Sequence, residues 1–487
     1  MDKILNVFRN NLSVLEIIGW LIAGAVISLV LLNVPLNYAL VTAGGLLVLV
    51  VTYTRPEIGI LSIVVLVSSI VFEESLGLIP IGIGSLHISD VMLLYLLFIM
   101  FRNHFSDDGS PFIRTPLDKW LLFFMATVLI SAILSIVHYG VGFNDVMRQA
   151  RHLAYYLLFF MVTNLVYTKE KIIFVIRAMF TIAVIVAITM ILQAIVGESV
   201  QLMPGRVETA RIFGRAYDAT RILPPGQTLV FVMFITSFCF LALQKRVSLL
   251  LSGYFYILPI LSIGILLTYN RNFWVATFLC IGILLVSIPF ENNKKLIAAI
   301  VILTMISGMG ILIFDKRGSK FNDTVLSISD RFTSLFTGEE LIKSRSLEIR
   351  RLENKYALVQ IKKHPLLGIG LGNTYRPPFW KTDTLTYYME NGYYWMATDM
   401  GIPALLFFMM FYLRFLFRSF KYWKTISDDF LRSALLGFML SGIGTIPIVV
   451  ISPVFMQWFS VVVIALCAGL SENIIRLNTL ETEPSIS

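Results

Sequence analysis

The polar residues best suited to chemistry in this 487-residue chain are arginines that gather beside apolar segments. Four of them share the segment 197–222: Arg206, Arg211, Arg215 and Arg221. A fifth, Arg271, stands at the start of a later apolar run, within Leu-Thr-Tyr-Asn-Arg-Asn-Phe-Trp. A single arginine next to a membrane span commonly extends its side chain to the lipid headgroups and has no further role. A cluster instead indicates a phosphate or pyrophosphate site, because guanidinium groups hold such oxygens with paired hydrogen bonds and keep their charge.

Other motifs favour neither nucleotide binding nor metal chemistry. The Gly-Ile-Gly-Leu-Gly run at residues 368–372 lacks the spacing of a dinucleotide fingerprint, and no lysine follows it as a phosphate loop requires. Acidic residues occur as adjacent pairs, such as Glu73 with Glu74, which solvated loops explain. The histidines, cysteines and carboxylates show no metal-ligand spacing. We therefore expect metal-independent chemistry without a cofactor.

Composition indicates that lipid surrounds most of the chain. Hydrophobic residues make up 57% of it and charged residues 14%, and the mean hydropathy is +0.81. An apolar run of about 20 residues crosses a bilayer as a helix, which satisfies its own backbone hydrogen bonds. We predict an all-α bundle of about 14 spans, with 12 as the lower bound. The runs are 13–32, 35–53, 58–72, 88–101, 117–138, 153–167, 172–196, 223–243, 249–268, 272–290, 296–314, 396–413, 433–451 and 454–470.

Lysine and arginine are concentrated in alternate short loops, which predicts the orientation of the bundle. If both termini lie in the cytoplasm, the cytoplasmic loops hold most of these residues, among them Lys245, Lys294 and Lys421. The net charge of +9 needs no nucleic-acid partner, because this asymmetry accounts for much of it. The arginine-rich segment 197–222 then lies outside the cytoplasm.

A long segment interrupts the bundle and divides the chain into three parts. Residues 1–314 are predicted to be a transmembrane bundle of about 11 spans, residues 315–395 an extracytoplasmic loop, and residues 396–487 the last three spans with a cytoplasmic tail. Within the loop, apolar residues from Ile349 to Val359 recur at helical spacing, which predicts a basic helix over residues 344–363. Pro365 and the glycines after it end that helix.

The segment His364-Pro-Leu-Leu-Gly-Ile-Gly-Leu-Gly-Asn373, with Glu390-Asn-Gly-Tyr-Tyr-Trp-Met-Ala-Thr-Asp-Met-Gly-Ile-Pro-Ala after it, resembles the signature region of the O-antigen ligase and O-antigen polymerase superfamily. Span number, the one long outer loop, Arg211-Ile-Phe-Gly214 and the position of Arg271 are similar too. The resemblance implies a bacterial inner-membrane glycosyltransferase. Its implied substrates are a glycan on undecaprenyl pyrophosphate and a sugar acceptor. The implied transfer inverts the configuration of the anomeric carbon and takes place at the outer face of the membrane, where the protein contacts membrane lipids.

The resemblance also implies roles for individual residues. Arg211 and Arg271 stand where the family uses arginines against the pyrophosphate, and we expect Arg215 and Arg221 to assist them. Arg350 matches the basic helix before the His-Pro motif and is expected to bind the pyrophosphate or the glycan. His364 belongs to that motif and is expected to be structural. A further expected substrate contact is Asn391.

Glu390 departs from the family pattern, because ligases carry a histidine at this position. A carboxylate can also accept the proton of an attacking sugar hydroxyl if its surroundings raise its pKa. A solvated glutamate paired with a nearby cation is the alternative. The loss of the histidine favours a polymerase over a ligase that transfers to lipid A core. A lipid-linked glycan transporter is a further alternative, although the internal repeats typical of transporters are absent. Whether a chain-length regulator binds is left open.

Overall fold

The computed structural model describes residues 36–105 except 69, 72, 74–78 and 81–84, then residues 111–212, 215–243, 253–289, 319–337 and 345–482, with single positions 294, 297 and 300. Two compact units divide the chain at residue 59. The first contains α2 (Leu36–Thr54), and α3 (Pro56–Val67) crosses the boundary. All residues discussed below belong to the second unit.

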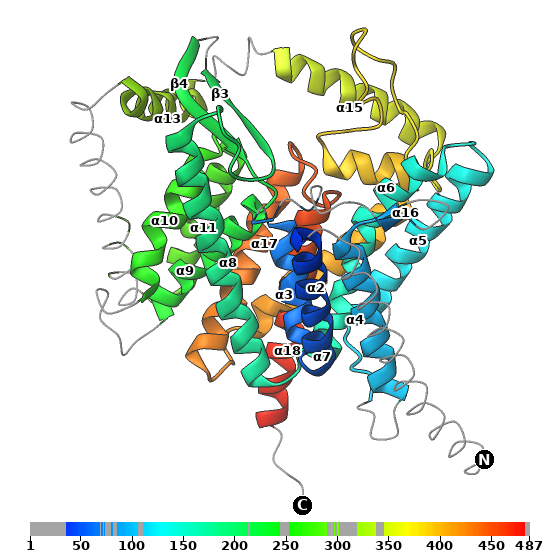
Figure 1. Ribbon diagram of the computed structural model, residues 1–487, viewed down its shortest axis with the longest axis vertical. Helices are drawn as coiled ribbons and strands as arrows, with labels where there is room; N and C mark the ends of the chain where they lie inside the picture. The colour runs from blue at the N-terminus through cyan, green and yellow to red at the C-terminus, as the bar shows by residue number, and fades with distance from the viewer. Residues whose placement is uncertain are drawn as a thin grey trace, which may run out of the picture. The chain divides into compact units, whose positions relative to one another are not determined.

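Helices dominate this second unit (Figure 1). Six are long and apolar enough, within the described residues, to cross a membrane. These are α4 (Ile88–Phe105), α5 (Asp118–Val137), α8 (Lys169–Val196), α16 (Gly392–Tyr422), α17 (Asp429–Val449) and α18 (Trp458–Thr482). The chain is therefore a multi-pass membrane protein. The shorter apolar helices of this unit, α9 (Gln227–Leu243), α10 (Gly253–Leu267) and α11 (Arg271–Ser287), pack among them.

Every predicted apolar run within the described residues contains a helix. The run predicted at 153–167 is interrupted, since a short 3-10 turn, η2 (Tyr155–Leu157), precedes α7 (Leu158–Leu165). The runs at 13–32 and 296–314 lie outside the described residues, so the count of about 14 spans stays a prediction. The segment between the runs at 117–138 and 153–167 forms the amphipathic α6 (Phe143–Ala154).

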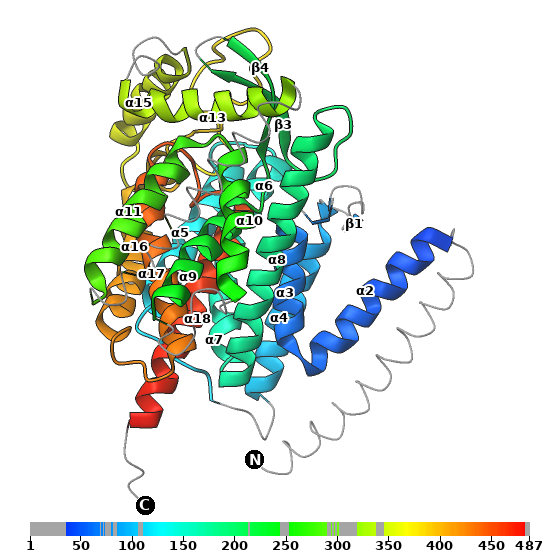
Figure 2. The same ribbon diagram turned by 90° about the vertical axis from the view of Figure 1, so that its left-hand side faces the viewer.

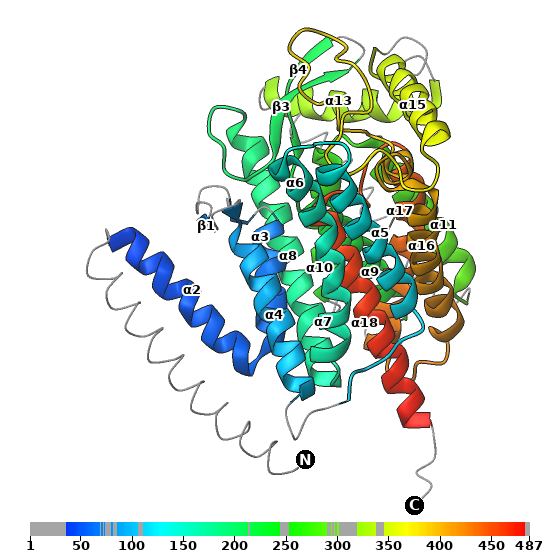
Figure 3. The ribbon, with the colours of Figure 1, turned by 90° about the vertical axis from the view of Figure 1, so that its right-hand side faces the viewer.

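One end of the bundle carries the elements that break the helical pattern. The strands β3 (Arg206–Ile212) and β4 (Arg215–Leu223), α13 (Ser319–Thr337) and α15 (Arg345–Lys363) lie there in all three views (Figures 1, 2 and 3). The two segments that the sequence assigned to outer loops therefore share one end of the molecule. The helix predicted at 344–363 is confirmed as α15.

The basic segment 197–222 was predicted as a loop in an all-α protein, and this part of the prediction is wrong. It forms an antiparallel hairpin in which Arg206 pairs with Leu223 and Glu208 faces Arg221. β-branched residues such as Val207, Thr209 and Ile222 favour strands. The cross-strand ion pair between Glu208 and Arg221 supports this register. A second, very short pair, β1 (Ile79–Pro80) and β2 (Ser85–Leu86), precedes α4.

α16 consists of two helical pieces. Gly401 interrupts it with φ of 85°, and Pro403 follows. The Ile402 amide, released from the helical ladder by this break, donates instead to the carbonyl oxygen of Pro365, at 2.8 Å. The interruption thus joins α16 to the segment that follows α15.

Candidate active site

The first part of the site is a junction centred on Tyr269, just before α11. Tyr269 has φ of 51°, and it is the only non-glycine residue in the described chain with positive φ. Its hydroxyl lies 2.9 Å from the Ser327 hydroxyl of α13, and the neighbouring Thr268 carbonyl accepts from Arg221 Nε at 3.3 Å. The Tyr269 junction therefore ties β4, α13 and the start of α11 together.

Arg271 is the first residue of α11 and so belongs to this junction. The Asn270 side chain caps the helix by accepting from the Asn272 amide at 3.3 Å. The helix dipole favours an anion at such a helix start. The predicted position of Arg271 at a helix boundary is confirmed.

Of the hairpin arginines, Arg221 lies at the Tyr269 junction. Its Nη1 donates to Glu208 at 2.9 Å. Burial lowers the pKa of Arg221, the charge of Glu208 opposes this effect, and the positive charges of Arg206 and Arg350 add to it. Arg221 is therefore within electrostatic range of α15, which supplies Arg350.

Arg211 and Arg215 lie near the turn of the hairpin. In the register, Arg211 faces Ala216 and Arg215 faces Ile212. Ala216 is five residues from Arg221, which corresponds to about 16 Å along a strand. The side chains of Arg211 and Arg215 lie outside what the structure describes, so their predicted approach to Arg271 remains a prediction.

The second part of the site is an ion pair between Arg350 of α15 and Glu390, which precedes α16. Arg350 Nε contacts Glu390 Oε2 directly, and the two side chains are 30% and 34% exposed. Two residues separated by 40 positions are thus brought together at a surface that a substrate can reach. The structure joins the predicted phosphate-binding arginine to the predicted proton acceptor.

Asn391 begins α16. Its side-chain oxygen accepts from the amides of Tyr393 and Tyr394, both at 3.1 Å. This cap fixes the chain direction at Glu390, immediately before the helix. A substrate contact for Asn391 stays a prediction, and the observed contact is a positioning one.

Glu353 is a site residue that the sequence reasoning missed. It follows Arg350 by three positions on α15, a spacing that places both on one helix face, and only 6% of it is exposed. Its Oε1 lies 3.6 Å from Arg376 Nη2. Burial and the negative charge of Glu390 together raise the pKa of Glu353 to about 7, against the opposing positive charges of Arg376 and Arg350. A carboxyl group that titrates near neutral pH suits proton transfer.

Arg376 organises the loop between α15 and α16. Its side chain is 3% exposed, and Nη1 donates to Asp383 Oδ2 at 2.6 Å. Further donors reach the carbonyl oxygens of Leu385 and Pro377, and the guanidinium carbon lies 4.0 Å from the ring centroid of Phe379. All of these contacts are local, so Arg376 holds together the part of the loop from Tyr375 to Leu385.

The glycines at 368–372 allow this segment to pack directly against the backbone of α16. Gly368 and Gly370 have φ of 68° and 90°, and a Cβ on Gly368 would lie 2.4 Å from the Asp399 backbone. Ile369 and Gly370 amides donate to the carbonyl oxygens of Thr398 and Asp399 at 2.8 and 3.0 Å. Only glycine permits this backbone-to-backbone approach beside the interruption of α16.

His364 ends α15, in agreement with the structural role predicted for it. Its amide donates to the Gln360 carbonyl at 2.8 Å, and its own carbonyl accepts from the Gly368 amide at 3.1 Å. The imidazole lies against Tyr139, with ring centroids 6.4 Å apart. The motif therefore holds α15, and with it Arg350 and Glu353, against the bundle.

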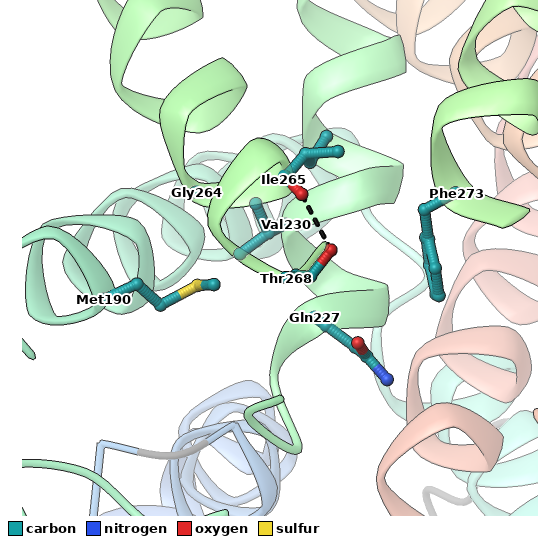
Figure 4. Close-up of a pocket in the computed structure, with 7 residues that line it drawn as sticks. All are labelled: Met190, Gln227, Val230, Gly264, Ile265, Thr268 and Phe273. Atoms are coloured by element: carbon teal, nitrogen blue, oxygen red, sulfur yellow. Dashed lines mark hydrogen bonds between the residues drawn. The ribbon is translucent and has the colours of Figure 1, made fainter. Parts of the chain in front are cut away.

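A gap inside the bundle lies below the Tyr269 junction and is not a ligand site. Figure 4 shows Met190, Val230 and Phe273 among the side chains around it, with the Thr268 hydroxyl bonded to the Ile265 carbonyl. No part of it admits a water-sized sphere. Thr268 is thus held from below by the bundle, while its carbonyl oxygen accepts from Arg221 above.

Comparison with known proteins identifies a family for part of the chain. No curated protein matches the chain. Residues 254–409 match the family model described as O-antigen ligase. This match covers α10, α11, α13, α15 and the first part of α16, and so includes Arg271, Arg350, Glu353, Arg376 and Glu390. The matched segment, about a third of the chain, is therefore similar to the O-antigen ligase and polymerase superfamily, and the match supports glycan transfer of this general type.

Proposed function

We propose that this protein is a polysaccharide polymerase of the bacterial inner membrane. It would transfer a glycan from undecaprenyl pyrophosphate to the non-reducing sugar of a lipid-linked repeat unit, on the outer membrane face. The observation that carries the proposal is the Arg350–Glu390 pair, in which a guanidinium group and a carboxylate stand side by side, both half-exposed. A phosphate can replace the carboxylate on the arginine, which frees Glu390 for the acceptor.

The proposed step is a single displacement. The acceptor hydroxyl oxygen attacks the anomeric carbon of the donor glycan, and the bond from that carbon to the pyrophosphate oxygen breaks. The pyrophosphate leaves with the bonding electron pair, against Arg271, Arg221 and Arg350, with Arg211 and Arg215 assisting from the hairpin. Such preorganised cations stabilise the charge that develops on the leaving group.

The proton of the acceptor goes to the carboxylates. Glu390 would orient the hydroxyl, and the Glu390–Glu353 pair would take the proton, since Glu353 accepts a hydrogen bond from the Glu390 backbone and the two charges are coupled. A carboxyl group with a pKa near 7, such as that of Glu353, can take up a proton at neutral pH. No metal ion or nucleotide is consumed in this scheme.

A ligase is the second candidate, and the description of the matched family favours it. Ligase and polymerase would share the donor side of the site and differ in the acceptor. The glutamate at position 390, where the ligase pattern has histidine, supports the polymerase. A lipid-linked glycan transporter remains a third and weaker candidate.

The experiment uses purified full-length protein in liposomes with the lipid-linked repeat unit as the only substrate. A polymerase yields a ladder of longer lipid-linked products without an ion gradient. A ligase extends nothing until lipid A core is added, and a transporter yields no new glycosidic bond. Arg271→Ala and Arg211→Ala should each abolish the ladder at unchanged protein level. Full ladders from both variants would refute the proposed pyrophosphate site.

A further inference from the structure

An open groove of about 700 Å³ runs between α15 and the loop that follows it. Tyr356, Gln360 and Lys363 of α15 line one wall, and Thr374, Pro377 and Thr386 of the loop line the other. The volume falls within the range of about 300–1,000 Å³ that is usual for small-molecule sites. The groove lies outside the membrane-spanning helices, and its lining residues on α15 and the following loop take no direct part in the proposed catalytic step.

The groove has the chemistry that recognises sugars. The half-buried ring of Tyr356 offers an aromatic face, and Phe379 supports it at 6.3 Å between ring centroids. Within the described part of the chain, no hydrogen bond engages the hydroxyl groups of Tyr356, Thr374 or Thr386. An apolar ring face beside unengaged hydroxyl groups matches a pyranose, which is apolar on its faces and hydroxylated at its edge.

The loop wall is rigid before any ligand binds. Tyr375 and the buried Arg376–Asp383 pair, which form its base, also line the groove. The Asp383 carboxylate accepts from the amides of Phe379 and Leu385 at 3.0 and 3.1 Å. Preorganisation of this kind lowers the entropy that is lost on binding.

Side-chain contacts link the groove to the candidate active site. Arg376 reaches Glu353 from the groove side, and the Tyr375 hydroxyl donates to the Tyr388 carbonyl at 3.2 Å, two residues before Glu390. A glycan bound in the groove would therefore lie next to the residues that position the two carboxylates.

We infer that the groove between α15 and residues 374–386 binds the growing glycan, as a hydroxyl-rich oligosaccharide stacked on Tyr356, and so holds the product between successive additions. This inference rests on the proposed function. Sugars bound in the groove lie some units away from the reacting bond, so the groove should influence product length more than the addition of a single unit.

The test measures binding separately from catalysis. The probe is a set of oligosaccharides obtained by partial acid hydrolysis of the surface polysaccharide of the source cells, each labelled with a fluorophore at its reducing end. Full-length protein is placed in phosphatidylcholine nanodiscs, which exclude anionic lipid headgroups as competitors, and binding is followed by fluorescence anisotropy. Tyr356→Ala should weaken binding about tenfold, because it removes the stacking surface.

Two further variants make the test robust. Thr374→Trp places a bulky side chain into the groove from an exposed position and should weaken binding without removing any packing. Leu358→Ala is the matched control, because Leu358 is 41% exposed on the same helix and faces a different groove with Arg351 and Lys355. Its affinity should equal that of the wild type.

Failure of the groove and failure of the proposed function are distinguishable. Arg350→Ala should bind the oligosaccharides normally while losing transfer, so binding without catalysis leaves the groove inference standing. In the liposome assay, Tyr356→Ala should give shorter products with unchanged first addition. Wild-type affinity and wild-type product length in both Tyr356→Ala and Thr374→Trp would overturn the inference, as would absence of binding to the wild type.

Discussion

The two ends of α16 each carry an arginine–glutamate pair, and the pairs differ in exposure. At the start of the helix, Arg350 and Glu390 meet through one guanidinium nitrogen, with both side chains about one-third exposed. Near its end, Arg418 binds Glu472 of α18 through two nitrogens at 2.7 and 3.0 Å, and the Glu472 side chain is 3% exposed. We call Arg350–Glu390 the open pair, because a ligand can reach it, and Arg418–Glu472 the closed pair, because its carboxylate is buried.

The difference in exposure indicates a difference in role. A buried charge is costly unless its partner stays in place, so the Arg418–Glu472 pair fixes α16 against α18. An exposed pair contributes little to stability, because water screens it. Arg350 can therefore release Glu390 for a pyrophosphate at small cost, which is what a binding arginine requires.

The largest expected effect is on folding, at the closed pair. Arg418→Ala should destabilise the protein by about 3–5 kcal/mol, since it leaves Glu472 buried and uncompensated. The measurement is the amount of folded protein and its thermal unfolding midpoint in detergent. Glu472→Gln in the same chain should restore part of the loss, and the activity per folded molecule should remain near that of the wild type. If Arg418→Ala folded normally but lost activity, the Arg418–Glu472 pair would serve catalysis and not folding.

At the open pair, Arg350→Ala should lower the transfer rate by about 10²–10³-fold, because it removes a cation that opposes the leaving pyrophosphate. The unfolding midpoint should change little. Arg351→Ala is the matched control, since the next residue on α15 is also basic but is exposed and points to another groove. Equal rates for the two variants would show that Arg350 is only a surface charge.

Two substitutions of Glu390 separate its role in orienting the acceptor hydroxyl from its role in accepting the proton. Glu390→Gln keeps the shape and hydrogen bonding but cannot accept a proton, so the rate should fall by about 10²-fold. Glu390→His supplies a base and should retain more activity than Glu390→Gln. The comparison uses initial rates of product formation at saturating acceptor. Full activity of Glu390→Gln would exclude the proposed role in proton transfer.

The smallest effect concerns Glu353 and depends on pH. Its pKa is raised from 4.5 to about 7, so the folded state favours the protonated group. The resulting stability is present below about pH 4.5 and is lost as the pH rises through about 7. Glu353→Gln should abolish this dependence, and the variant should gain about 1–3 kcal/mol relative to wild type between pH 4.5 and pH 8. If the free energies of unfolding of Glu353→Gln and the wild type differed by the same amount at all pH values, this would contradict the raised pKa of Glu353.

The helices of the bundle were predictable from residue type alone. An apolar run must satisfy its backbone hydrogen bonds within itself when lipid surrounds it, so the runs at 172–196 and 433–451 could form little else. α15 was predictable for a similar reason, because its apolar residues recur at helical spacing. The hairpin at 206–223 is harder to predict, because its charged residues interrupt the alternation of apolar and polar residues typical of a strand, and only its β-branched residues favour one.

The sequence by itself determined which segments enter the membrane and which arginines and carboxylates are available for chemistry. Only the tertiary structure decided that Arg350 meets Glu390, that Glu353 is buried beside them, and that Arg376 turns a polar loop into one wall of a groove. The reason is physical. Helix formation depends on neighbours along the chain, whereas an ion pair, a pKa shift or a groove depends on residues tens of positions apart that packing brings together.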